Sequence, residues 1–308
     1  MPLTRRTLLF ASALRAFAQE PRFSTGVDVV TLFATVRDRD GRVVKDLVRD
    51  DFTVTDDGKR QTIRYFARES DLPLTIGLLV DTSRSQRRVL EPERRASYRF
   101  LDQVLREGKD RAFIASFDIA VDLLQDFTSS RAELAAALER LRIPDRTATL
   151  IYEAIRSTSE NQMRSQMGRK AFILLSDGVS FRDPVSIGTA IEYAQRADSI
   201  IYSVLYEGPG VRAALPAGAR RINFSLPRRR GHEVMQRLAR ETGGSYFEIS
   251  DALPIEKAYT DIEDTLRNQY SIGFTPAPPG KSGQYRRIKL ATRHRGLAVR
   301  TRDGYYAK

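Results

Sequence analysis

Between Leu74 and about Arg267, short apolar runs alternate with segments in which apolar residues recur at helical spacing. Each run is almost continuously apolar, which is typical of a strand in a parallel sheet covered by helices on both faces. The predicted strands are Leu74–Val80, Ala112–Phe117, Ala171–Leu175, Ile200–Leu205 and Ser245–Ile249. The predicted helices are Leu90–Leu105, Arg131–Leu141, Ile151–Met163, Ile187–Ala197, Glu233–Glu241 and Pro254–Leu266. This alternation predicts a doubly wound, mostly parallel α/β sheet.

The segments that flank this region have shorter, alternating patterns that indicate β-strands. The strands expected there are Val29–Val36, Phe52–Thr55, Thr62–Phe66, Tyr270–Phe274, Tyr285–Ala291 and Leu297–Arg302. Neither end of the chain has enough strands to bury two sheet faces by itself. We therefore expect both ends to complete one β-sandwich, with the α/β domain inserted between them. The alternative is two independent β appendages. The predicted boundaries are a signal peptide at 1–18, β segments at 24–70 and 269–308, and the α/β domain at 71–268.

The first residues have the pattern of an export signal. Arg5 and Arg6 precede a short apolar stretch, and Ala16-Phe17-Ala18 supplies the small residues of a cleavage site. The paired arginines favour the twin-arginine export route, with the general secretion route as the alternative. No later stretch is long and apolar enough to span a membrane. We expect an exported protein, either periplasmic or at the cell surface, with no transmembrane segment after signal removal.

Composition excludes several kinds of chemistry. The chain has no cysteine, which excludes disulfides, thiolate zinc sites and cysteine nucleophiles, and its two histidines have no accompanying Gly-x-Ser-x-Gly motif. The formal net charge is +12, and the basic residues gather at the N-terminus, in 209–231 and in 281–308. Few aromatic residues lie among them, so nucleic-acid binding is not favoured. The loop at 209–231 is a secondary candidate for docking an anionic envelope polymer.

Polar residues follow the first apolar strand directly. Leu74–Val80 ends in Asp81, and two serine hydroxyls follow at positions 83 and 85. Ligands bind at the carboxyl edge of open α/β sheets, and ligand sets made only of oxygen suit hard dications such as Mg²⁺. The simpler interpretation is that Asp81 and Ser83 cap the following helix. This segment alone leaves both interpretations open.

Two further segments supply oxygen atoms in the same way. Asp177 and Gly178 end the apolar strand that begins near Ala171, and Thr149 lies at the start of a predicted helix. Taken singly, Asp177-Gly178 is an ordinary turn and Thr149 an ordinary N-cap. Together with the segment after the first strand, they indicate a ligand site more specifically than any one of the three segments does.

Over about Leu72–Arg267 the chain resembles a von Willebrand factor A-type domain. The resemblance rests on Asp81-x-Ser83-x-Ser85, on Thr149 leading into Leu-Ile-Tyr-Glu-Ala, and on Asp177-Gly178. The flanking β segments also resemble secreted bacterial VWFA-related proteins. The family places a metal-ion-dependent adhesion site at these positions. The resemblance implies a non-enzymatic protein-binding module whose protein ligand supplies a carboxylate to the ion.

The resemblance also implies a role for each residue. Ser83, Ser85 and Thr149 would offer hydroxyl ligands, while Asp81 and Asp177 would bind the ion, often through water. Two carboxylates and neutral hydroxyls leave a dication able to attract an incoming carboxylate. We expect Mg²⁺, with Mn²⁺ or Ca²⁺ as alternatives.

Three neighbouring residues have weaker assignments to ligand binding. Arg84 is a bulky cation that points outward or selects an acidic ligand, and Gly178 permits the turn after the second strand. Thr147 is the alternative to Thr149 as hydroxyl ligand, because the chain has Arg146-Thr147-Ala148 where the family often has glycines.

Two other functions compete with adhesion. In one, the protein is a structural or assembly subunit whose metal only stabilises the fold. In the other, it is a phosphatase of the haloacid dehalogenase type that uses Asp81. That chemistry needs a second aspartate two positions on, where this chain has Ser83. On the helix at 90–105 and just after it, the acidic residues are expected to form a solvated face: Glu91, Glu93, Asp102 and Glu107.

Overall fold

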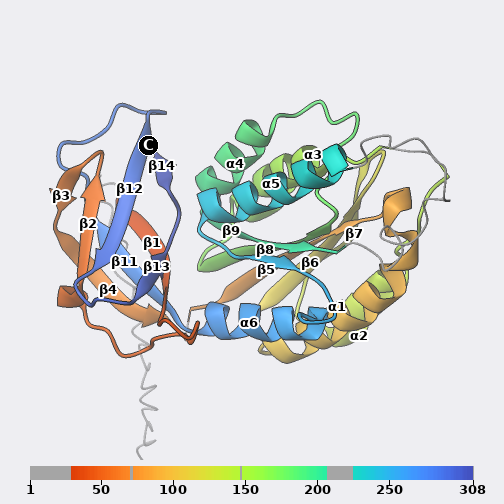
Figure 1. Cartoon of the computed structure of the whole chain (residues 1–308), viewed down its shortest axis with the longest axis horizontal. Helices are drawn as coiled ribbons and strands as arrows, with labels where there is room; N and C mark the ends of the chain where they lie inside the picture. The colour runs from red at the N-terminus through yellow and green to blue at the C-terminus, as the bar shows by residue number, and fades with distance from the viewer. Residues whose placement is uncertain (1–28, 70–71, 146–147, 207–224, 308) are drawn as a thin grey trace, which may run out of the picture.

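A computed structural model describes residues 29–69, 72–145, 148–206 and 225–307. Two units lie side by side in Figure 1: a large sheet with helices on both faces, and a smaller all-β unit to its left. The predicted signal peptide and most of the basic loop fall outside the described residues. In the described part of the chain, no helix combines the length and apolar character needed to cross a membrane.

The large sheet has six strands in the order β10-β9-β8-β5-β6-β7. All neighbours are parallel except β7, which runs antiparallel to β6. Every residue of β5, β8 and β9 is buried, as expected for strands covered on both faces. The strands are β5 (Leu74–Asp81), β6 (Arg111–Phe117), β7 (Val121–Thr128), β8 (Arg169–Ser176), β9 (Ser199–Leu205) and β10 (Tyr246–Glu248). The predicted α/β architecture is confirmed.

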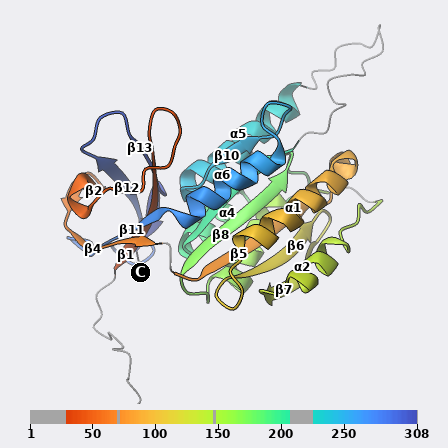
Figure 2. The same cartoon turned by 90° about the horizontal axis from the view of Figure 1, so that it is seen from below.

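Helices cover both faces of this sheet (Figures 1 and 2). On one face α1, α2 and α6 pack over a continuous apolar cluster, and on the other α3, α4 and α5 pack over a second cluster. The helices are α1 (Leu90–Val104), α2 (Arg131–Leu138), α3 (Ile151–Thr158), α4 (Ile187–Arg196), α5 (Ser225–Thr242) and α6 (Ile255–Arg267). The predicted third helix, Ile151–Met163, is divided: α3 ends at Thr158 and a π-helical turn, η3 (Ser159–Met163), follows.

The all-β unit consists of two four-stranded sheets, ordered β13-β1-β11-β4 and β14-β12-β2-β3. Strands from opposite ends of the chain pair in both sheets, β1 with β11 and β2 with β12. Apolar residues of both sheets share one buried cluster. The strands are β1 (Val30–Arg37), β2 (Phe52–Asp56), β3 (Lys59–Gln61), β4 (Ile63–Glu69), β11 (Gln269–Phe274), β12 (Tyr285–Thr292), β13 (Ala298–Arg300) and β14 (Gly304–Tyr306).

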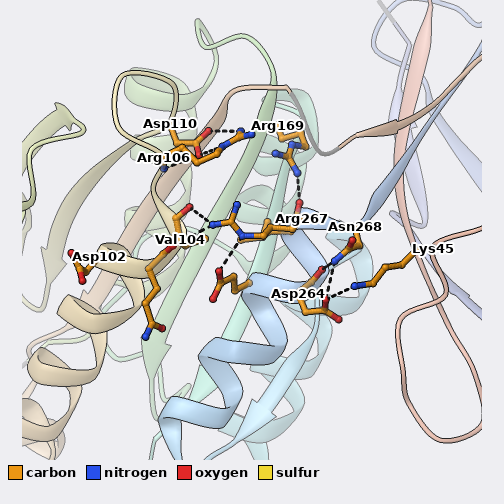
Figure 3. A network of polar contacts seen from close by, with 12 residues as sticks. Lys45, Asp102, Val104, Arg106, Asp110, Arg169, Asp264, Arg267 and Asn268 are labelled. Atoms are coloured by element: carbon orange, nitrogen blue, oxygen red, sulfur yellow. Dashed lines mark hydrogen bonds and ion pairs between the residues drawn. The ribbon is translucent and has the colours of Figure 1, made fainter.

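Polar contacts fix the junction where α6 leads into β11 (Figure 3). Arg267, the last residue of α6, donates to the carbonyl of Val104 at 3.2 Å and forms an ion pair with Glu263 at 3.0 Å. One turn earlier, Asp264 accepts from Lys45 of the all-β unit at 3.0 Å. Helix α6 is thus bound both to α1 and to the neighbouring unit.

Candidate metal centre

Asp81 is the last residue of β5, and its side chain is fully buried. One carboxylate oxygen, Oδ1, accepts a hydrogen bond from the backbone amide of Ser83 at 2.8 Å. The other, Oδ2, accepts one from the hydroxyl of Ser176 at 2.5 Å, across the sheet at the end of β8. These two bonds fix the orientation of the carboxylate at the carboxyl edge of the sheet.

The two serines after Asp81 bring their hydroxyl groups together. The Oγ atoms of Ser83 and Ser85 lie 3.0 Å apart, where Ser83 is buried and Ser85 is exposed. Ser83 precedes a short 3₁₀ helix, η2 (Arg84–Arg88), but its side chain makes no capping hydrogen bond. The N-cap of α1 is Val89. Ser83 is thus the N-cap of η2 by position only, and neither Asp81 nor Ser83 is the N-cap of α1. The carboxylate of Asp81 instead accepts from the amide of Ser83 within the turn.

Asp177 and Gly178 lie directly after β8, beside the end of β5. Asp177 is half-buried, and its Oδ1 accepts from the amide of Val179 at 3.0 Å. Gly178 has φ +75°, and a Cβ there would lie 2.4 Å from the carbonyl oxygen of Gly231. Only glycine meets both requirements, so this turn depends on Gly178 for its shape.

Thr149 is buried and paired with the loop that follows β8. Its amide donates to the carbonyl of Phe181 at 2.9 Å, and the amide of Phe181 donates back at 3.1 Å. The next amide, of Leu150, donates to the carbonyl of Asp118, whose side chain accepts from the hydroxyl of Thr82 at 2.7 Å. These contacts hold Thr149 at the same sheet edge as Asp81. Leu150, and not Thr149, is the N-cap of α3.

The weaker candidates are placed as follows. Arg84 is exposed at the start of η2. Thr147 lies outside the described residues, so the choice between Thr147 and Thr149 stays a prediction.

The site is short of positive charge. Burial, and then the negative charge of Asp177, raise the pKa of Asp81 to about 7, although hydrogen bonds from Ser176 and Ser83 oppose the rise. A bound cation would relieve this effect, because it favours the ionised form of a buried carboxylate that has a negative charge nearby. Among the described residues, no three His, Asp or Glu side chains could hold an ion by themselves. Ligands for an ion at this edge would therefore include hydroxyl groups, which suit a hard dication.

The raised pKa of Asp81 leads to a testable pH dependence. Between about pH 4, where an unfolded aspartate titrates, and about pH 7, folded Asp81 keeps a proton that the unfolded chain has lost. The contribution of Asp81 to the free energy of unfolding of the metal-free protein should therefore decrease as the pH rises through this window. This contribution is measured by urea denaturation of wild type and Asp81→Asn, in chelator and at several pH values. If the difference in the free energy of unfolding between the two proteins stays constant from pH 4 to pH 8, the assignment of the raised pKa to Asp81 is contradicted.

The sequence interpretation missed two residues and misplaced a third. Ser176 and Asp118, which orient Asp81 and Thr82, were not among the candidates. Ser176 had a signal, because it directly precedes Asp177 at the end of a strand. Glu93 was expected on a solvated face with Glu91, but its residue exposure is 1%. That expectation is wrong.

Comparisons with known proteins support the fold. No protein-family model and no curated protein matches this chain. Among solved structures, proximal thread matrix protein 1 from the mussel byssus, with a zinc-occupied MIDAS motif, is 13% identical with a TM-score of 0.51. The match covers 68% of this chain and 49% of that chain.

Two bacterial structures are similar over nearly their whole length. The vWF domain of the pilus tip protein Mfa5 from Porphyromonas gingivalis is 14% identical, with a TM-score of 0.48 and coverage of 64% of this chain and 95% of that chain. BatB from Bacteroides thetaiotaomicron is 17% identical, with a TM-score of 0.43 and coverage of 63% and 97%. With the sheet order and the strand-end turns, the comparison with the mussel protein shows the fold. The central part of this chain has the fold of a von Willebrand factor A-type domain.

Proposed function

We propose that this chain is an exported, non-enzymatic adhesion-type module that binds an acidic group of a partner protein through a divalent cation. The observation that carries the proposal is the buried carboxylate of Asp81, which lies beside Ser83, whose hydroxyl meets that of Ser85, and within electrostatic reach of Asp177. In the proposal these residues and Thr149 hold Mg²⁺, with Mn²⁺ or Ca²⁺ as alternatives. The ion would supply a positive centre for the partner's carboxylate.

Exposed apolar side chains near the site favour a protein partner. Phe181, which pairs with Thr149, is 49% exposed, and Ile119, next to Asp118, is 41% exposed. Apolar side chains that surround a polar centre on a surface are typical of interaction sites. Arg182 lies over the ring of Phe181, with 5.3 Å between its guanidinium carbon and the ring centroid. Its positive charge would favour an acidic partner.

The remaining parts of the proposal follow from the sequence. The charged N-terminus supports export to the periplasm or the cell surface, and the two terminal sheets would form a β-sandwich that carries the binding module. The phosphatase interpretation is not proposed, because Ser83 stands where that chemistry needs a second aspartate. The basic loop at 209–231 stays a secondary candidate for an anionic envelope polymer.

Ion-dependent capture tests the proposed function. Immobilised protein should retain an envelope protein in Mg²⁺, release it in chelator, and fail to retain the same extract after its carboxyl groups have been converted to amides. Thermal melts with and without Mg²⁺ should be run in parallel. Stabilisation by Mg²⁺ without any ion-dependent capture would instead favour the structural or assembly subunit.

A further inference from the structure

Glu93 is a buried carboxylate without a partner. It lies in the first turn of α1, its residue exposure is 1%, and neither of its carboxylate oxygens has a hydrogen-bond partner in the structure. A buried polar group without a protein partner is rare, and contact with an ion or with water is one of its recognised explanations. An ionised carboxylate has only acceptor atoms, so the partner that Glu93 lacks in this form is a hydrogen-bond donor or a cation.

Glu93 lies near the carboxyl edge of the sheet, because α1 follows the end of β5 after the short helix η2 and Glu93 is in the first turn of α1. The charges that act on Glu93 agree with this position. Burial raises the pKa of Glu93 well above the ordinary value, and the negative charges of Asp81 and Asp177 raise it further. Glu93 is therefore within electrostatic reach of both carboxylates of the candidate metal centre. A partner of opposite charge would relieve the repulsion among the three groups.

We propose that Glu93 is a third acidic group of the cation centre and acts on the ion through coordinated water. This inference rests on the proposed cation site. Direct coordination is not part of it, because no three acidic or histidine side chains among the described residues are placed to hold one ion together. Water bound to a dication is a strong hydrogen-bond donor, which is what the two oxygens of Glu93 lack.

The charge of the centre gives Glu93 a consequence for affinity. Asp81 and Asp177 together balance one dication, and Glu93 adds a further negative charge nearby. The ion should then bind more tightly than it would without the charge of Glu93. Groups that hydrogen-bond to the ligands or waters of a metal commonly change its affinity by about 10–100-fold. The competing explanation is a neutral, protonated Glu93 that fills space in the core.

Titration with Mn²⁺, followed by calorimetry or by the electron paramagnetic resonance of free Mn²⁺, separates the two explanations. Glu93→Gln keeps the shape and removes the charge, so its affinity for Mn²⁺ should be about 10-fold weaker than that of wild type. Glu91→Gln is the matched control, because Glu91 lies on the same helix and its side chain is 64% exposed. The affinity of this variant for Mn²⁺ should equal that of wild type. Equal Mn²⁺ affinity of Glu93→Gln and wild type would overturn the proposal.

Thermal melts provide a second readout. In chelator, Glu93→Gln should melt no lower than wild type, because a buried acidic group has been removed. Mn²⁺ should raise the melting temperature of this variant less than that of wild type. If the Gln variant does not fold, Glu93→Met, of similar length and without charge, takes its place and must show the same weaker Mn²⁺ binding. If Asp81→Asn also binds Mn²⁺ like wild type, the proposed site itself fails. If only the Glu93 variants bind normally, this inference alone fails.

Discussion

Replacing Asp81 with Asn is expected to reduce divalent-cation affinity by about 100-fold, the upper end of the effect of groups that act on a metal through its ligands or waters, because one of the two carboxylates of the proposed centre loses its charge. Asn keeps the shape of the side chain, and its amide oxygen can still accept from the amide of Ser83. Its NH₂ group can donate to the hydroxyl of Ser176, which now lies 2.5 Å from Asp81 Oδ2. We therefore expect the fold to be retained.

Calorimetric titration with Mg²⁺ and Mn²⁺ measures this loss, and circular dichroism checks the fold. Asp122→Asn is a suitable control, since Asp122 is an exposed aspartate on the edge strand β7 of the same sheet. A folded Asp81→Asn variant that binds either ion as tightly as wild type would exclude Asp81 as a ligand.

The structure also decides which substitution to use at position 81. A site at the edge of the sheet, outside the core, would tolerate Asp81→Ala without an effect on the fold. The side chain is in fact fully buried and accepts two hydrogen bonds. Ala would leave both donors without an acceptor, at a cost of about 1–3 kcal/mol each. Asn avoids this loss of stability.

Replacing Arg286 with Ala is expected to lower the free energy of unfolding by about 3–5 kcal/mol, the typical cost of leaving one member of a buried ion pair without its partner. Arg286 on β12 donates to Asp56 on β2 at 2.8 Å, and the two side chains are 5% and 0% exposed. The hydroxyl of Tyr305 also donates to Asp56, at 3.0 Å, and would remain. A neutral hydroxyl cannot replace the lost positive charge.

Urea denaturation of wild type, Arg286→Ala and Arg287→Ala measures this effect. Arg287 is the next residue on the same strand and is exposed, so its removal should change the free energy of unfolding by less than about 0.5 kcal/mol. Similar small losses for both variants would show that the buried pair does not hold the two ends of the chain together.

The parts of the fold that the sequence predicted are those with the strongest burial. Strands β5, β8 and β9 are buried at every residue, so each produced a continuous apolar run. Strand β7 was missed because it lies at the sheet edge, where its side chains are only partly buried and its sequence includes Asp122, Gln125 and Asp126. An edge strand lacks the neighbour that would make its pattern apolar.

The candidate site could be proposed from the sequence in its residue types, but its supporting contacts could not. Asp81, Ser83 and Asp177 were chosen as candidates because each follows an apolar run, whereas the bond from Ser176 to Asp81 depends on the order of the strands. Glu93 carried a signal that was overlooked. It occupies a position of the buried stripe of α1, three residues after Leu90 and seven before Phe100. A charged residue in an apolar stripe indicates a buried charge, and not a solvated face.

The two connections of the α/β unit have a mechanical consequence. The chain enters this unit from β4 and leaves it into β11, and these strands are antiparallel neighbours whose ends, Glu69 and Gln269, lie opposite each other. A pull on the carboxyl edge of the sheet would therefore reach the all-β unit along two covalent paths at once. Tension would be shared between two adjacent strands, so each of them would bear less than a single tether would.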